Sequence, residues 1–235
     1  MKNKLILALP LAGIALVLAS CGDKTTSETT TTESNNNNTI VYSNETYYAS
    51  PNGVASANGT KGSPVDIRTG FNKLKAGDTL ILLDGTYNLP ERILIDKTQN
   101  GASGHMITVK ADDNANVTLD FSQQNIAGTS RGVQINADYW HLYGFDVKGA
   151  GDNGVYIAGS YNIVENCSFH ENQDTGLQIG RASSDLTNIK DWPHNNLIKN
   201  CTSYNNYDYQ SYGENADGFA AKLTTGEGNV FDGCI

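Results

Sequence analysis

The sequence predicts an all-β fold, a parallel β-helix (solenoid) of about 22 residues per coil with a short N-terminal capping helix. Two ladders of residues indicate it. In the first, a glycine precedes each of the similar segments GVQI, GVYI, GLQI and GFAAKL, with steps of 22, 22 and 42 residues (Gly132, Gly154, Gly176 and Gly218). The second ladder runs beside it (Phe145, Cys167, Cys201 and Cys234). A fixed period with two strand-like pieces per period and no helix between them is typical of a solenoid.

The first twenty residues predict export. Lys2 and Lys4 precede an apolar stretch that ends in small residues before Cys21, which is the order found in signal peptides. The ending Leu-Ala-Ser-Cys resembles a bacterial lipobox, in which the cysteine is acylated after cleavage. We therefore expect residues 1–20 to be a lipoprotein signal peptide and the protein to be lipid-anchored through Cys21 at the extracellular cell surface. An uncleaved anchor helix is the alternative, but the apolar stretch is short for a membrane span.

The segment after Cys21 predicts a flexible Thr/Asn-rich tether at residues 21–38. Residues 22–38 contain no aromatic or aliphatic side chain, so they bury nothing that offsets the entropy of ordering them. The remaining residues, 39–235, are within the usual size of one domain. We expect them to form a single β-helix domain, truncated at its C-terminal end.

The domain opens with turn signals and one helix. Pro-Asn-Gly and Gly-Ser-Pro punctuate residues 46–64. In VDIRTGFNKLKAGD, Ile67, Phe71 and Leu74 have helical spacing, which predicts an amphipathic helix that covers the end of a sheet. From Thr79 onward, TLILL, RILI and MITVKA are short strand-like pieces separated by Gly, Asn and Asp.

The 42-residue step contains one coil plus 20 extra residues. Twelve of them fall between Gly176 and Cys201, in RASSDLTNIKDWPH, and eight fall between Cys201 and Gly218, in YDYQSYGEN. Insertions at the corners of a regular coil build the walls of a groove.

The cysteines and asparagines are interpreted as structural. Cysteines at equivalent positions of successive coils should stack inside as small buried hydrophobic residues, because stacking along a ladder gives poor disulfide geometry. A bridged pair stays open in an exported protein. No Cys-x-x-Cys or adjacent histidine pair indicates zinc, and the four histidines show no spacing of a relay. Asparagines before the same strands can hydrogen-bond along a corner (Asn162, Asn166, Asn196, Asn200 and Asn229).

The charge of the chain excludes nucleic acid as a partner. The formal charge is −9, and −11 once Lys2 and Lys4 leave with the signal, whereas phosphate binding needs clustered Lys and Arg. Gly154, Gly176 and Gly218 of the ladder each have an aspartate one or two residues before them (Asp152, Asp174 and Asp217). Neighbouring coils lie about 4.8 Å apart, so stacked carboxylates are a candidate calcium site. The alternative is ordinary Asp-Gly turn chemistry.

From about Tyr139 to the end, the segments NCSFHENQDTGLQIG, NNLIKNCTSYNNYD, ENADGFAAKL and GNVFDGC resemble the central coils of the family 9 polysaccharide lyases, the right-handed parallel β-helix pectate lyases. The N-terminal motifs YYASPNG and KAGDTLILLDGTYN are shared more loosely by exported β-helix proteins. The resemblance implies a right-handed β-helix and calcium-dependent cleavage of pectate (polygalacturonate). In this β-elimination a base removes the proton at C5 and the 4-linked oxygen leaves.

The resemblance also assigns residues. It implies that Asp217, in NADGFAAKL, is a calcium ligand, and that the cation (Ca2+) acts as a Lewis acid between two acidic partners. The family's other ligands and its catalytic lysine come further downstream. We therefore expect them beyond Ile235, with no catalytic residue within this chain, and expect the N-terminal fragment alone to be inactive.

Lys222 is the basic candidate within the motif. If Phe219, Ala221 and Leu223 face inward, Lys222 points outward and could contact a sugar carboxylate. The alternative is that this lysine is simply solvated.

Two other functions stay open. A glycoside hydrolase on this fold would need paired carboxylates, for which Asp185, Asp191 and Glu214 in the insertions are available but not visibly paired. A non-catalytic surface solenoid that binds polysaccharide is the other possibility. In each case we expect a monomer that contacts the membrane only through its N-terminal lipid.

Overall fold

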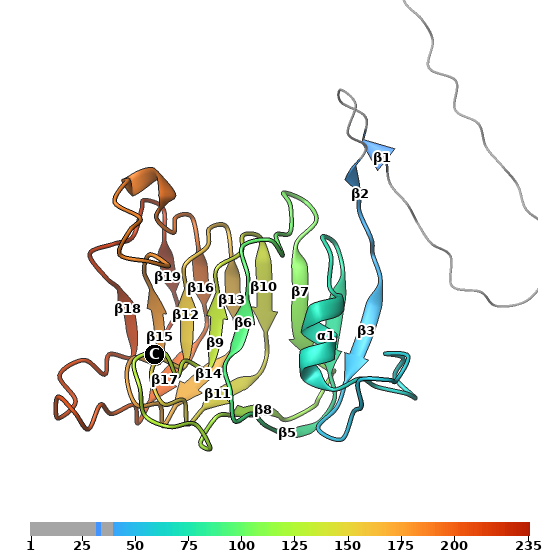
Figure 1. The fold of residues 1–235 in the computed structure, drawn as a ribbon, viewed down its shortest axis with the longest axis horizontal. Coiled ribbons are helices and arrows are strands. Elements are labelled where there is room, and N and C mark those ends of the chain that lie inside the picture. The colour runs from blue at the N-terminus through green and yellow to red at the C-terminus, as the bar shows by residue number, and fades with distance from the viewer. Residues whose placement is uncertain (1–31, 34–39) are drawn as a thin grey trace, which may run out of the picture.

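The computed structural model describes residues 32–33 and 40–235, and from Thr46 onward the chain forms a parallel β-helix (Figure 1). Its strands build three parallel sheets. Sheet I contains β6 (Ile93–Ile95), β9 (Val133–Ile135), β12 (Val155–Ile157), β15 (Leu177–Ile179) and β18 (Phe219–Ala221). Sheet II contains β3 (Thr46–Ala49), β4 (Thr79–Leu82), β7 (Ile107–Ala111), β10 (Trp140–Tyr143), β13 (Ile163–Glu165), β16 (Leu197–Lys199) and β19 (Val230–Asp232). Sheet III contains β5 (Gly85–Asn88), β8 (Val117–Asp120), β11 (Asp146–Lys148), β14 (Ser168–His170) and β17 (Thr202–Tyr204).

The glycine ladder predicts sheet I correctly. Val133, Val155, Leu177 and Phe219, which follow the four glycines, are paired in register from coil to coil. The expectation of two strands per coil is wrong, because each complete coil has three. Sheets II and III are separated by only two residues, such as Asn166 and Cys167, so their strands read as one apolar segment in the sequence.

The predicted interior ladder is confirmed. Phe145, Cys167 and Cys201 are at most 2% exposed, and Cys234 packs partly buried against the same core. The three described cysteines are free thiols. They therefore act as small hydrophobic residues in the core, as their stacking predicts.

The asparagines before the sheet II strands form the predicted hydrogen-bonded ladder. The side-chain oxygen of Asn162 accepts from the backbone N–H of Trp140 (2.8 Å), and that of Asn196 accepts from the N–H of Asn162 (2.9 Å). Asn229 continues the ladder by accepting from the N–H of Asn196 (3.1 Å). Each coil is thus tied to the next at this corner.

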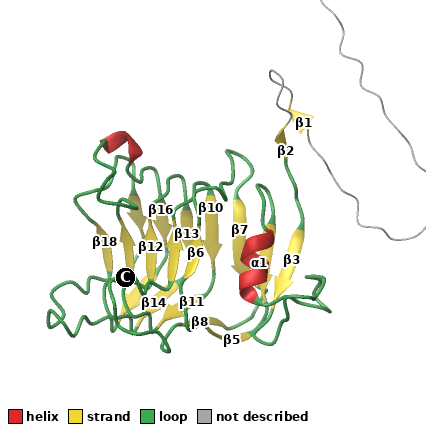
Figure 2. Cartoon of the chain, viewed as in Figure 1, coloured by secondary structure: helices red, strands yellow, loops and turns green. Residues whose placement is uncertain are grey.

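The predicted helix is α1 (Ile67–Lys73), the one α-helix of the described residues (Figure 2). The side chain of Asp66 caps it by accepting from the N–H of Thr69 (3.0 Å). Ile67, Phe71 and Leu74 are buried, and the Phe71 ring lies 6.1 Å from that of Trp140. The apolar side of α1 therefore packs onto the interior of the N-terminal coils.

Two N-terminal strands, β1 (Thr32–Glu33) and β2 (Ile40–Val41), pair antiparallel. Residues 32–33 belong to the segment predicted as a tether. The predicted signal peptide, Cys21 and the other tether residues lie outside the described residues. Within the described part, no helix has the length and apolar content needed to cross a membrane.

Candidate functional site

The two insertions flank the ends of the sheet I strands. Residues 181–194 follow β15 and include the short 3-10 helix η1 (Ile189–Asp191), while residues 205–217 precede β18. In Figure 1 the first lies at the upper edge of the solenoid and the second at its lower left. The outer face of sheet I lies between them, and the groove that the sequence predicts there stays a prediction.

Asp217 lies just before β18 and Lys222 just after it, and their side chains form an ion pair. The Nζ of Lys222 donates to Oδ2 of Asp217 at 2.7 Å, and the two side chains are 39% and 48% exposed. Lys222 therefore points outward, as predicted. Leu223 does not face inward but is 98% exposed, because β18 ends at Ala221 and the alternation stops in the turn that follows.

The predicted stack of three aspartates does not form one acidic cluster. Oδ2 of Asp152 lies 3.4 Å from Nε of Arg131, and Asp174 accepts from Nδ2 of Asn153 (3.2 Å). Asp217 stands one residue before its glycine rather than two and pairs with Lys222, which directly follows β18. The coils thus give these carboxylates separate partners.

A polar network on the outer face of sheet I was not found from the sequence. The guanidinium of Arg131 lies 3.4 Å from the ring centroid of Tyr156, whose hydroxyl donates to the backbone oxygen of Arg181 (2.9 Å). Gln134 and Tyr156 are only 5% and 6% exposed although they point away from the core. Burial raises the pKa of Tyr156, so its phenol stays protonated. The sequence feature that could have indicated this network is the third residue of GVQI and GVYI, which is polar and occupies an outward position.

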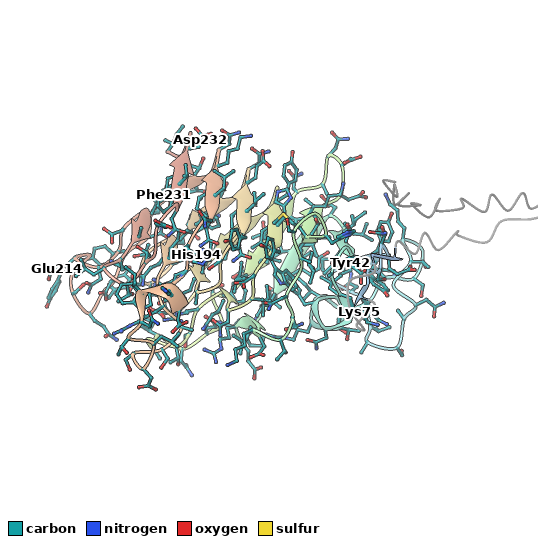
Figure 3. The ribbon with its side chains drawn as sticks, turned by 90° about the horizontal axis from the view of Figure 1, so that it is seen from above. Tyr42, Lys75, His194, Glu214, Phe231 and Asp232 are labelled. Carbon is teal, nitrogen blue, oxygen red and sulfur yellow. The ribbon has the colours of Figure 1, made fainter. Side chains whose placement is uncertain are left out.

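The three carboxylates that could serve a hydrolase do not form a pair among the described residues. Asp185 and Asp191 are exposed on the first insertion, and Glu214 is exposed on the second. Figure 3 shows Glu214 at the periphery of the molecule, well away from His194 of the first insertion. This arrangement gives no support to a two-carboxylate mechanism.

The described residues include no group of three or more His, Cys, Asp or Glu that could hold a metal ion. Asp217 is an exposed carboxylate with a single ion-pair partner, so it suits one oxygen ligand of calcium, which prefers oxygen donors. These residues offer part of a cation site and an adjacent ammonium group that could bind an anion.

Two hollows belong to different regions. One of about 500 Å³ lies beneath the first insertion, beyond the ends of the sheet I strands, and includes Asn136, Asp138 and Trp192. The larger, of about 720 Å³, lies among the N-terminal coils and includes Asp84 and Asp112. Neither includes Asp217 or Lys222, so the larger volume does not mark the chemistry of the NADGFAAKL motif.

Comparison with known proteins gives one consistent picture. The family model described as "Pel9A-like, right handed beta helix region" matches residues 47–235. The chain is 43% identical over 188 residues to "Pectate lyase L" of Paenibacillus polymyxa (strain SC2), covering 80% of this chain and 41% of that protein.

Among solved structures, pectate lyase Pel9A superposes with a TM-score of 0.72 at 33% identity, covering 81% of this chain and 47% of that one. A rhamnogalacturonan lyase gives a TM-score of 0.65 at 25% identity, covering 81% and 51%. The chain thus spans about half, or less, of the length of these relatives.

Proposed function

Because the chain belongs to the family of Pel9A-like right-handed β-helix proteins, we propose that it forms part of a lyase that cleaves a pectate-type acidic polysaccharide by β-elimination. The observation that carries the proposal is the pairing of Asp217 and Lys222 on the outer face of sheet I, between the two insertions. The names of the relatives support the reaction class and an acidic substrate.

We further propose that Asp217 is a calcium ligand, as its motif implies. When bound, calcium would supply a Lewis acid that neutralises charge developing on the sugar carboxylate. The exposed ion pair with Lys222 has little net stability, so the carboxylate can exchange its ammonium partner for a cation. A calcium ion held by this carboxylate would also bridge the protein, whose charge is −9, and an anionic polymer.

Lys222 is proposed to bind a sugar carboxylate. Its ammonium group is held on the same outer face as Asp217, so it can orient an anionic sugar. No described residue is assigned as the base that removes the C5 proton. We propose that this base lies beyond Ile235. The predicted lipoprotein signal, the lipid on Cys21 and the monomeric state are parts of the same proposal, which places the protein at the cell surface.

The decisive measurement is the ultraviolet absorbance of unsaturated uronates released from polygalacturonate by the full-length protein, with calcium and with a chelator. We expect a calcium-dependent rise, its loss in Asp217→Asn, and no effect of Asp185→Asn, an exposed carboxylate on the other insertion. Residues 39–235 alone should release no product.

Rhamnogalacturonan is the second substrate to assay, because a rhamnogalacturonan lyase shares the fold. Full activity in chelator, or in Asp217→Asn, would show that Asp217 is not the metal ligand. No product from either polymer under any condition would contradict the lyase.

A further inference from the structure

One corner of the solenoid combines backbone strain with exposed aromatic rings. At this corner, just ahead of four successive sheet II strands, equivalent positions are left-handed, with φ of 61°, 59°, 55° and 73° (Tyr139, Tyr161, Asn195 and Gly228). Tyr139 directly precedes β10, and the other three lie two residues before β13, β16 and β19. Asn and Gly adopt this conformation at little cost, whereas it is a genuine outlier for a bulky residue. Strain that recurs at equivalent positions motivates a search for function.

The two strained tyrosines form a rigid aromatic column. Their ring centroids lie 4.8 Å apart and their planes differ by 4°. The ring of His194, from the first insertion, meets Tyr161 edge-on at 5.0 Å. Tyr161 is 40% exposed, so the column presents a hydroxyl-bearing aromatic edge to solvent.

The two tyrosines do not themselves line the hollow of about 500 Å³ beneath the first insertion, but Tyr161 contacts His194, which does. Ser160 and His194 line this hollow and also border Tyr161, and the Ser160 hydroxyl accepts from the backbone N–H of His194 (3.1 Å). Trp192 adds a second aromatic surface, which is fixed because its indole N–H donates to the oxygen of Leu186 (2.7 Å). The insertion therefore roofs a preformed cavity with aromatic groups on one side.

The polar lining of the hollow favours hydroxyl groups over carboxylates. Lys97 and Lys190 are outnumbered by the acidic side chains of Asp96, Asp138 and Asp191, so the hollow has no excess of positive charge. The Asp138 carboxylate is held in place by the backbone N–H of Ser160, which donates to its Oδ1 (2.7 Å). A concave site with aromatic surfaces and a few fixed polar groups is the usual composition of a small-ligand site.

We propose that this corner binds a neutral pyranose sugar, as a saccharide site separate from Asp217 and Lys222. The apolar face of the sugar contacts the aromatic groups, and its hydroxyls are bound by Asp138 and its neighbours. The site does not depend on the lyase activity or on calcium.

The test is the affinity of the full chain for galactotetraose, a neutral probe, measured by calorimetry in chelator. Tyr161→Asn should weaken binding by about tenfold or more, since one aromatic anchor contributes at least 1.4 kcal/mol, the equivalent of tenfold. The variant should fold, because asparagine occupies the equivalent corner at position 195. Asp138→Asn, which keeps an oxygen to accept from Ser160, should weaken binding several-fold.

Tyr204→Asn is the matched control. Tyr204 is 45% exposed and stacks on His170 at 4.7 Å, on sheet III and away from the hollow. Its replacement should leave the affinity unchanged, with thermal unfolding recorded for every variant.

Three results would overturn the proposal. The unmodified chain could fail to bind galactotetraose, or Tyr161→Asn could bind as tightly as Tyr204→Asn. Tetragalacturonate could also lose more affinity than galactotetraose in Tyr161→Asn, which would contradict a neutral ligand.

Discussion

Asp152 and Asp217 show how one residue of offset changes the chemistry of an Asp-Gly corner. Asp152, two residues before Gly154, is 8% exposed and faces Arg131. Asp217, one residue before Gly218, is half-exposed and pairs with Lys222. The sequence shows an aspartate at both corners but could not distinguish these environments, because burial depends on which loop covers the corner.

The stability of the protein should depend on pH through Asp152. Burial raises the pKa of this carboxyl, an effect that Asp174 reinforces and Arg131 opposes. The folded state therefore holds the proton more tightly than the unfolded state, and the free energy of unfolding falls as pH rises from 3.8, the ordinary value, through the raised pKa.

Asp152→Asn removes this titration, so it should gain stability relative to the unmodified protein between about pH 3.5 and pH 7. Thermal unfolding of both proteins at the two pH values is the measurement. A relative loss for the variant at the higher pH would mean that the attraction of Arg131 outweighs burial.

At the scale of elements, the residues at the corners indicate each coil in the sequence more clearly than the strands do. The sheet I strands were recognisable because each follows a glycine, and α1 because its apolar residues have helical spacing. The third sheet was not, because its strands contain only three or four residues and in the later coils only two residues separate them from the sheet II strands. A second asparagine ladder, in which Asn206 accepts from the N–H of Asn172 (3.1 Å), was also missed because only two residues mark it.

Removal of one member of the first ladder should cost much stability. Asn162 is fully buried, and in Asn162→Ala the N–H of Trp140 and the carbonyl of Ala137 lose their partners. Leaving two buried backbone groups unsatisfied should lower the free energy of unfolding by about 2 to 4 kcal/mol.

Urea unfolding measures this loss, and the same substitution at the half-buried Asn229 is the comparison. A similar or larger loss at Asn229 would show that burial does not set the contribution of the ladder.

At the scale of the whole molecule, the fold was predictable and the candidate site only in part. The repeat predicted the solenoid, and the NADGFAAKL motif predicted the outward direction of Lys222, whereas the role of Asp217 as a calcium ligand stays a prediction. The Arg131–Tyr156 stack and the tyrosine column depend on side chains from different coils meeting across corners. No local pattern in the sequence indicates such contacts between coils.

The net charge yields a prediction about how the protein binds its proposed substrate. A chain of charge −9 repels polygalacturonate, and monovalent salt screens that repulsion over about 10 Å at 0.1 M. In chelator, the affinity for polygalacturonate should therefore rise as sodium chloride is added.

Under the proposal that calcium bridges the protein and the polymer, salt should weaken binding when calcium is present, because screening then reduces an attraction. Titrations at two salt concentrations, with calcium and with chelator, measure the two slopes. Opposite signs support calcium as the bridge, whereas binding that weakens with salt in chelator as well would require a basic surface that acts without the metal.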